Sequence, residues 1–281
     1  MITQVHSPVA KYKSPAIIAR IKGYRVIIHA HNNNLHNCGF LQRSLHSINR
    51  QVQKYMKITR LTNSDLSAKF FFGDKLATMI YNAIDITRFS FNEKVRNSLR
   101  EKLNLQNKHV YGFAGRLAYQ KNPLFLIDVF YEIKKIDKEA AFLICGDGDM
   151  SEETKQKAVN LGLNVIFLGA VPNVQDYYQA MDVFILPSLF EGLGIVLIEA
   201  QCSGLPCLAS GKVIPKSAQV TKLLDFVQLD DNPDVWAIES VKKANASHSR
   251  HQYSRLLSKT RFNINVEAET LKKIIEIENI D

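Results

Sequence analysis

Residues 182–210 read DVFILPSLFEGLGIVLIEAQCSGLPCLAS. A continuous apolar run at 182–186 leads into a proline, a glycine-containing loop and a helical pattern at 193–203, and a second apolar run follows at 206–209. Strands buried on both faces of a parallel sheet have this continuous apolar character, whereas half-solvated strands alternate. This stretch therefore predicts a strand, a crossover helix and a second, parallel strand.

The same alternation continues on both sides of this stretch. Further strands are predicted at residues 2–6, 25–29, 58–62, 78–81, 109–113, 141–145, 164–168 and 226–228. Helical periodicity is found at residues 15–22, 41–54, 66–72, 92–103, 123–136, 151–161, 174–180, 233–244 and 265–278. The predicted fold class is α/β, with two Rossmann-like, doubly wound domains.

The polar stretch 85–107 holds one predicted helix and separates two β/α regions. Residues 108–245 contain six of the predicted strands, enough for a doubly wound domain, but residues 1–82 contain only four. We therefore expect an incomplete N-terminal domain at 1–85, an inter-domain segment at 86–107, a second domain at 108–260, and a terminal helical segment at 261–281.

Composition excludes several classes of protein. The 281 residues are 46% hydrophobic and 22% charged, which is typical of a globular chain. No apolar run approaches the roughly 20 residues of a membrane-spanning helix, and residues 1–20 lack the pattern of a signal peptide. The four cysteines (Cys38, Cys145, Cys202 and Cys207) lack zinc-site spacing. They are expected to be reduced, buried thiols of a cytoplasmic protein.

The positive charge is concentrated at one end of the chain. The net charge is +9, but residues 1–80 hold 12 basic residues against Asp65 and Asp74, a balance of +10. Such asymmetry suggests a partner that carries phosphates: a nucleic acid, an anionic membrane surface or a phosphorylated small molecule. A solvated basic face is the alternative.

Three segments follow predicted strands and could approach a ligand. In GFAGRLAYQKN (residues 112–122), Arg116 and Lys121 follow a glycine turn, and two long cations can converge on a diphosphate or form an ordinary solvated pair. ICGDGDM (residues 144–150) lacks the third glycine of a dinucleotide fingerprint and reads as a tight turn. Gly192 and Gly194 expose backbone amides at a predicted helix start, where an anion can bind.

Two glutamates belong to this third segment. Glu191 lies in the loop, and Glu199 comes eight positions later, within the apolar run IVLIEA. A carboxylate can accept two hydrogen bonds from a vicinal diol, so one glutamate suits a ribose and the other a hexose. Because an unpaired carboxylate in apolar surroundings is costly, the context of Glu199 favours a binding role.

Histidines cluster in YRVIIHAHNN, residues 24–33. His29 and His31 are two apart at a strand end, so their side chains leave the same face of the sheet. A ligand-facing role and a structural role are equally compatible with this spacing, and His6 ends another predicted strand. No Asp, Glu or Cys lies in the segment, so no metal site is predicted.

Taken in order, these elements resemble the glycosyltransferases of family 4, most closely the bacterial enzymes that build capsular polysaccharides and exopolysaccharides. The similarity runs from VHSPVA at the N-terminus through GRLAYQKN, GDGD and LPSLFEGLGIVLIEAQCSGLP to DDNPDVWA at residues 230–237. The resemblance implies a GT-B fold of two Rossmann-like domains and a retaining transfer that needs no metal or other cofactor. It also places the last helix on the N-terminal domain.

The resemblance further implies a role for each matching residue. Arg116 and Lys121 would grip the diphosphate of a nucleotide-sugar, beside Gly115 and the amides of Gly194 and Ile195. Glu199 would hold the ribose and Glu191 the donor hexose. The strand-end histidine, matched first by His31 and second by His29, would face the anomeric carbon. The donor is expected to be a UDP-sugar on the resemblance alone, since no residue pattern reads the base.

The implied partners are the nucleotide-sugar, a glycan or lipid-pyrophosphate-linked acceptor and an anionic membrane surface. The expected location is the cytoplasm, at the inner face of the cell membrane, and the oligomeric state is left open. A catalytically silent or partner-dependent donor-binding remnant is the main alternative, because the first domain is expected to be incomplete. A nucleic-acid-binding protein ranks far behind, since residues 1–80 carry no recognition motif. A nucleotide-sugar epimerase of the same fold fits LFEGLGIVLIEAQ less well than a transferase does.

Overall fold

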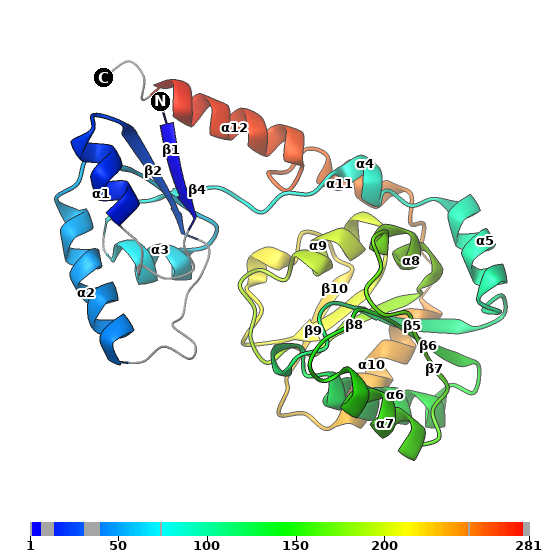
Figure 1. Cartoon of the computed structure of the whole chain (residues 1–281). Coiled ribbons are helices and arrows are strands. Elements are labelled where there is room, and N and C mark those ends of the chain that lie inside the picture. The colour runs from blue at the N-terminus through cyan, green and yellow to red at the C-terminus, as the bar shows by residue number, and fades with distance from the viewer. Residues whose placement is uncertain (1, 7–13, 31–39, 74, 247, 278–281) are drawn as a thin grey trace. The chain divides into compact units, whose positions relative to one another are not determined.

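The computed structural model describes residues 2–6, 14–30, 40–73, 75–246 and 248–277. The chain folds into two compact units (Figure 1). The first combines the described residues up to Ala83 with those from Asn265 onward, and the second runs from Ile84 to Ile264. Each unit is an α/β sandwich around a wholly parallel sheet, as the sequence predicted.

The sheet of the first unit has the strand order β1-β2-β3-β4 among the described residues. Its register pairs Ile2 with Arg25 and Ile27 with Thr59. The elements of this unit are β1 (Ile2–His6), α1 (Ser14–Ile21), β2 (Arg25–Ala30), α2 (Phe40–Lys54), β3 (Thr59–Thr62), α3 (Asp65–Phe72), β4 (Thr78–Met79) and α12 (Ile264–Ile277).

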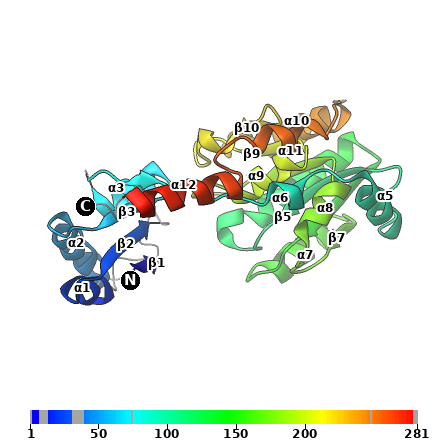
Figure 2. The ribbon, with the colours of Figure 1, turned by 90° about the horizontal axis from the view of Figure 1, so that it is seen from above.

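Alternate residues of β2 build two separate cores in this unit. Val26, Ile28 and Ala30 pack with α1 and α3 on one face of the sheet. Ile27 packs on the other face with Leu61, Ile80 and the apolar side of α12. Figures 1 and 2 show α1 and α12 on opposite sides of the sheet. Arg25 also donates to the carbonyl of Ile275, which ties α12 to β2.

The sheet of the second unit has the order β10-β9-β8-β5-β6-β7 among the described residues. Because the chain passes from β7 at one edge back to β8 beside β5, the strand order reverses between β5 and β8. The strands are β5 (His109–Ala114), β6 (Ala140–Cys145), β7 (Val165–Phe167), β8 (Val183–Leu186), β9 (Cys207–Ser210) and β10 (Leu224–Val227).

Helices cover both faces of this second sheet, with α8 and α9 on one face and α6, α7 and α10 on the other (Figure 1). The helices are α4 (Ile86–Phe89), α5 (Glu93–Lys102), α6 (Pro123–Ile136), α7 (Ser151–Asn160), α8 (Val174–Ala180), α9 (Ile195–Cys202), α10 (Pro233–Asn245) and α11 (Gln252–Leu257), with short 3-10 turns η1 (Tyr119–Lys121) and η2 (Lys216–Ala218). The four residues of β8 are fully buried, which explains their continuous apolar sequence.

Residues 86–107 pack as part of the second unit, whereas the sequence predicted a separate inter-domain segment there. Arg96 and Arg100 of α5 form ion pairs with Asp182, the residue before β8. The backbone of Ile84 also bonds to Phe262 and Ile264, which joins the two ends of this unit. Charged residues on α5 therefore fix the segment that looked like a polar linker.

Cys145, Cys202 and Cys207 are buried and free, as the sequence predicted, and Cys38 lies outside the described residues. Within the described part of the chain, no helix is long and apolar enough to cross a membrane.

Candidate functional site

Three loops at the carboxyl ends of β5, β6 and β7 are joined by backbone hydrogen bonds. The amide of Gly115 donates to Cys145 at 2.9 Å, and the amide of Gly146 donates to Gly169 at 2.7 Å. A Cβ at Gly146 would lie 1.8 Å from the carbonyl oxygen of Gly115, and one at Gly148 would lie 2.2 Å from that of Leu117. The GDG sequence is therefore needed for close packing of these loops, beyond forming a turn.

A cavity of about 330 Å³ opens beside these loops. It lies at the carboxyl ends of the strands, close to the reversal of strand order where open α/β sheets bind ligands. Its walls come from the ends of β5 and β6 and from one side each of α8 and α9. The lining includes Gly115, Arg116, Gly146, Asp147, Val174, Tyr178, Val196 and Glu199.

Glu199 lies half-buried on α9, as its apolar sequence context predicted, and it lines this cavity. Its Oε2 accepts a hydrogen bond of 2.9 Å from the hydroxyl of Tyr178, whose side chain is fully buried. Burial raises the pKa of the Glu199 carboxyl, although the Tyr178 hydrogen bond and the charge of Arg88 act in the opposite direction. A carboxylate held at this cost beside a cavity is typical of a binding residue.

The two predicted cations have different surroundings. Arg116 lines the cavity with an exposed guanidinium, 3.6 Å from Asp149. Lys121 is largely buried and forms an ion pair with Glu191. Its Cε lies 3.5 Å from the position that a Cβ on Gly115 would occupy, so Lys121 lies directly behind the glycine turn. Arg116 and Lys121 thus flank Gly115.

Glu191 is almost completely buried, with 7% of its side chain exposed. Besides Lys121, its carboxylate accepts hydrogen bonds from Ser188 at 2.8 Å and from Gln120 at 3.4 Å. The sequence suggested that Glu191 and Glu199 hold two sugars, and the structure gives them separate partners. Glu199 lines the cavity, and Glu191 lies in a polar cluster with Lys121.

The start of α9 supplies free backbone donors. Gly194 has left-handed φ and ψ of 75° and 59° and precedes the first helical residue, Ile195, with no side-chain cap. Among the described residues no protein group accepts from the amides of Gly194 and Ile195. Such unpaired first-turn amides can bind an anion.

Of the two predicted strand-end histidines, the structure describes His29, which lies in the first unit. His29 is buried near the carboxyl end of β2, in register with His6 of β1. His31 lies outside the described residues, so its predicted role stays a prediction. No cluster of His, Cys, Asp or Glu that could hold a metal occurs in the part of the chain that the structure describes.

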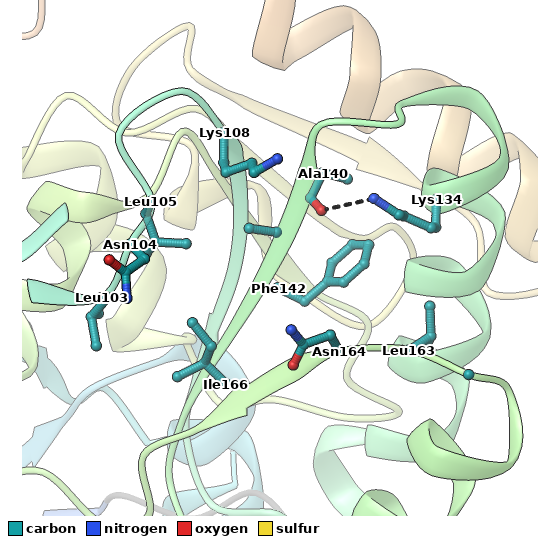
Figure 3. A pocket seen from close by; sticks show the side chains of 12 residues that line it. Leu103, Asn104, Leu105, Lys108, Lys134, Ala140, Phe142, Leu163, Asn164 and Ile166 are labelled. Atoms are coloured by element: carbon teal, nitrogen blue, oxygen red, sulfur yellow. Dashed lines mark hydrogen bonds between the residues drawn. The ribbon is translucent and has the colours of Figure 1, made fainter. Parts of the chain in front are cut away.

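A second cavity, of about 440 Å³, lies at the amino ends of β5, β6 and β7 (Figure 3). The ring of Phe142 occupies the middle of its lining. Its two cations are already engaged, since Lys134 donates to the carbonyl of Ala140 and Lys108 pairs with Glu139. Ligands of such sheets bind at the other end of the strands, so this cavity is not the candidate site.

Tyr178 is the site residue that the sequence reasoning missed. It lies 21 positions before Glu199, on a helix predicted for its apolar pattern alone. The only sequence signal for Tyr178 was the carboxylate of Glu199, because a buried carboxylate requires a hydrogen-bond donor from another element.

Comparison with known proteins places this site in a family. Residues 95–220, which contain all of the cavity lining, match the family model described as "Glycosyl transferases group 1". This region, just under half of the chain, is similar to that family. The group 1 region begins on α5 and ends after η2, so it covers the sheet from β5 to β9.

Curated proteins similar to this chain include bacterial glycosyltransferases. The chain is 26% identical over 253 residues to a putative glycosyltransferase, EpsF, of Bacillus subtilis (strain 168), covering 85% of this chain and 65% of that protein. It is 30% identical over 213 residues to the UDP-Gal:alpha-D-GlcNAc-diphosphoundecaprenol alpha-1,3-galactosyltransferase of Escherichia coli, covering 69% and 54%. The chain therefore spans about half to two thirds of the length of these relatives.

Among solved structures, the Anabaena protein Alr3699/HepE in complex with UDP and glucose is similar, with a TM-score of 0.75 at 21% identity over 93% of this chain and 74% of that one. This similarity establishes the GT-B architecture that the sequence resemblance implied.

Proposed function

We propose that the chain is a retaining glycosyltransferase. It transfers a hexose or an N-acetylhexosamine from a UDP-sugar to a glycan or lipid-linked saccharide, in the synthesis of an exopolysaccharide or capsule. The observation that supports this proposal most directly is the cavity at the carboxyl ends of the strands, which both Glu199 and Arg116 line. The E. coli relative, whose name specifies UDP-Gal and a diphosphoundecaprenol acceptor, supports the proposal, as does the UDP bound to the Anabaena protein.

The cavity and the residues beside it have the chemical groups that a nucleotide requires; Glu199 and Arg116 line the cavity. The Glu199 carboxylate accepts hydrogen bonds from the two ribose hydroxyls. The diphosphate lies between Arg116, Lys121 and the first-turn amides of α9, which supply fixed positive charge. A volume of about 330 Å³ is at the lower end of typical small-molecule sites and suits the nucleotide part of the donor.

Catalysis in this proposal rests on stabilising the departing diphosphate. The bond between the anomeric carbon and the diphosphate oxygen breaks, and the electron pair leaves with UDP. The acceptor hydroxyl attacks on the same face, and its proton passes to the departing diphosphate oxygen. Lys121 and the amides are fixed before reaction and need no reorganisation as charge develops, and the exposed Arg116 adds a further positive charge.

From the sequence resemblance we propose two further roles. Glu191 would hold the hexose, and His31, with His29 second, would act at the anomeric carbon. Every step uses side chains and backbone amides of the chain, and the proposal needs no metal ion.

The first experiment is calorimetric titration of the 281-residue chain with UDP, GDP and their sugars, without metal. We expect binding of UDP and preferential binding of one UDP-sugar, followed by transfer when a lipid-linked acceptor is added. A folded chain that binds none of these compounds would contradict the proposal. Binding without transfer to any acceptor would favour the donor-binding remnant.

Replacement of Tyr178 by phenylalanine is expected to weaken UDP binding about five- to tenfold at pH 7, since one hydrogen bond of about 1 kcal/mol is lost. Because that hydrogen bond lowers the pKa of Glu199, its removal raises this pKa further. The carboxylate is then protonated at a higher pH, so the loss of affinity should grow as the pH falls. Calorimetry between pH 5 and pH 8 measures this trend.

The matched control is Tyr177→Phe, the neighbouring position on α8, which should leave UDP affinity unchanged. Equal affinities of wild-type protein and Tyr178→Phe at every pH would show that Tyr178 does not act on Glu199.

We also propose that the first unit binds an anionic membrane surface through α2 and the residue that follows it. Phe40, Ile48 and Val52 follow one another on α2 at intervals of eight and four positions, and their exposed fractions are 83%, 59% and 39%. Tyr55, just after the helix, is 89% exposed, and Arg43 is exposed on the same helix. An exposed apolar stripe with basic neighbours can lie in a membrane interface, where each Lys or Arg adds about 1 kcal/mol on anionic lipid.

We expect the chain to sediment with vesicles containing phosphatidylglycerol and to remain in solution with neutral vesicles. Combined replacement of Phe40 and Tyr55 by serine should reduce this binding about tenfold or more. The control is Leu76→Ser, a residue 95% exposed elsewhere in the first unit. Equal loss in both variants, or equal binding to neutral vesicles, would contradict an interfacial role of α2.

A further inference from the structure

The ion pair between Lys121 and Glu191 joins two elements of the proposed donor site that are 70 residues apart in the sequence. Lys121 ends η1, and Glu191 lies in the loop between β8 and α9. Both side chains are largely buried, with 15% and 7% exposed. The carboxylate therefore lies against the cation that is expected to bind the diphosphate.

The surrounding contacts fix this pair in place. The amide of Leu189 donates to the carbonyl of Gln120 at 2.8 Å, and the side chain of Gln120 donates to the carbonyl of Phe190 at 3.0 Å. Ser188, which is fully buried, donates to Oε1 of Glu191. The pair cannot simply dissociate into solvent, so a diphosphate at Lys121 has to bind in the field of the Glu191 carboxylate.

This field acts differently on the two diphosphates that the site meets. A UDP-sugar carries two negative charges, whereas free UDP gains about one more near neutral pH because a terminal phosphate has a pKa of about 6. Like charges at close range in a partly buried site repel strongly. The intact donor also offers Glu191 hexose hydroxyls in return, and UDP offers none.

We propose that Glu191 selectively weakens the binding of the UDP product and thereby promotes its release. The inference rests on the proposed function, because it assumes that the diphosphate of a UDP-sugar binds at Lys121. Glu191 would then have two roles: it contacts the donor sugar, and it discriminates between the donor and the UDP product.

Glu191→Gln separates this role from a purely structural one. The amide oxygen can still accept hydrogen bonds from Lys121 and Ser188, so the loop remains attached while the charge is lost. The matched control is Glu139→Gln, which removes the carboxylate from another lysine pair, Lys108–Glu139, at the amino end of the sheet. Glu191→Ala is a second variant that removes the same charge.

The experiment is calorimetry of UDP and UDP-glucose on the full chain at pH 5.5 and pH 8. We expect Glu191→Gln to bind UDP on the order of tenfold more tightly than wild-type protein at pH 8. The gain should be smaller at pH 5.5, where the terminal phosphate is largely protonated, and UDP-glucose should not bind more tightly at either pH. Glu139→Gln should retain the wild-type ratio of the two affinities.

Unchanged or weaker UDP binding in Glu191→Gln and Glu191→Ala would overturn the inference alone. A gain that is equal for UDP and UDP-glucose would also overturn it, since the carboxylate would then not discriminate between them. Wild-type protein that binds neither compound would overturn the proposed function, and this inference with it.

Discussion

The Glu199→Ala variant is expected to bind UDP about a hundredfold more weakly than the wild-type chain. Two hydrogen bonds from the ribose to a carboxylate are lost, and bonds to a charged group contribute about 1.5–3 kcal/mol each. A loss of about 3 kcal/mol corresponds to roughly a hundredfold in Kd. Calorimetric titration of both proteins with UDP measures this difference directly.

The charge of Glu199 should not stabilise the folded protein at pH 7. Burial raises the pKa of Glu199 in the folded protein, so the ionised carboxyl is less favourable in the folded chain than in the unfolded chain. A group with a raised folded pKa contributes stability at low pH and loses that contribution as the pH rises through the folded value. At pH 7, removal of the Glu199 charge should therefore not lower the melting temperature through electrostatics.

Glu153→Ala is the matched control, because Glu153 is an exposed glutamate of α7 in the same unit. It should change neither UDP affinity nor melting temperature. A Glu199→Ala protein that is folded and binds UDP as tightly as wild type would exclude Glu199 from the ribose site. If weak binding were accompanied by a large fall in melting temperature, the effect would instead be one of folding.

Local sequence patterns predicted most of the fold because parallel strands are buried on both faces. The apolar run that becomes β8 is an example, since its environment leaves no polar position along the strand. Short helices were not predicted, because a short segment shows no clear sequence pattern. α4 has four residues and α11 has six, too few for a helical period to emerge from the sequence.

Glu199 could be predicted because a carboxylate inside an apolar helix is unusual in itself. Its partner Tyr178 could not, since a buried tyrosine in an apolar pattern resembles any core aromatic residue. The Lys121–Glu191 ion pair could not be predicted either, because sequence spacing does not show that η1 and the loop before α9 lie together. These contacts depend on the strand order, which places β5 next to β8.

Asp182→Asn is expected to destabilise the second unit by about 3–5 kcal/mol, since the loss of one partner leaves buried charges uncompensated. The carboxylate of Asp182 pairs with Arg96 at 2.5 Å and with Arg100 at 3.0 Å, and it accepts the amide of Val110 at 2.8 Å. Nearby, desolvation of the half-buried Arg250 guanidinium lowers its pKa to about 9. Asp182 is therefore the counter-charge for a cluster of arginines that joins α5 to the sheet.

Urea unfolding followed by tryptophan fluorescence isolates this effect, because Trp236 is the single tryptophan of the chain and is fully buried in the second unit. The control is Asp230→Asn, which removes an exposed partner of Lys212 and should cost less than about 1 kcal/mol. If Asp182→Asn lay within 1 kcal/mol of wild type, the arginine cluster would not depend on this carboxylate.

The pH dependence gives an independent check on the same variant. Burial alone would raise the pKa of Asp182, but Arg96, Arg100 and the Val110 amide outweigh it, and the pKa lies below its ordinary value. A lowered folded pKa contributes stability above the unfolded value of about 3.9, and that contribution is lost as the pH falls through the folded value. The stability difference between wild type and Asp182→Asn should therefore be full at pH 6–7 and shrink below about pH 4. A difference that stayed constant down to pH 3 would indicate that the asparagine acts through packing, because only a charge interaction disappears when the wild-type carboxylate is protonated.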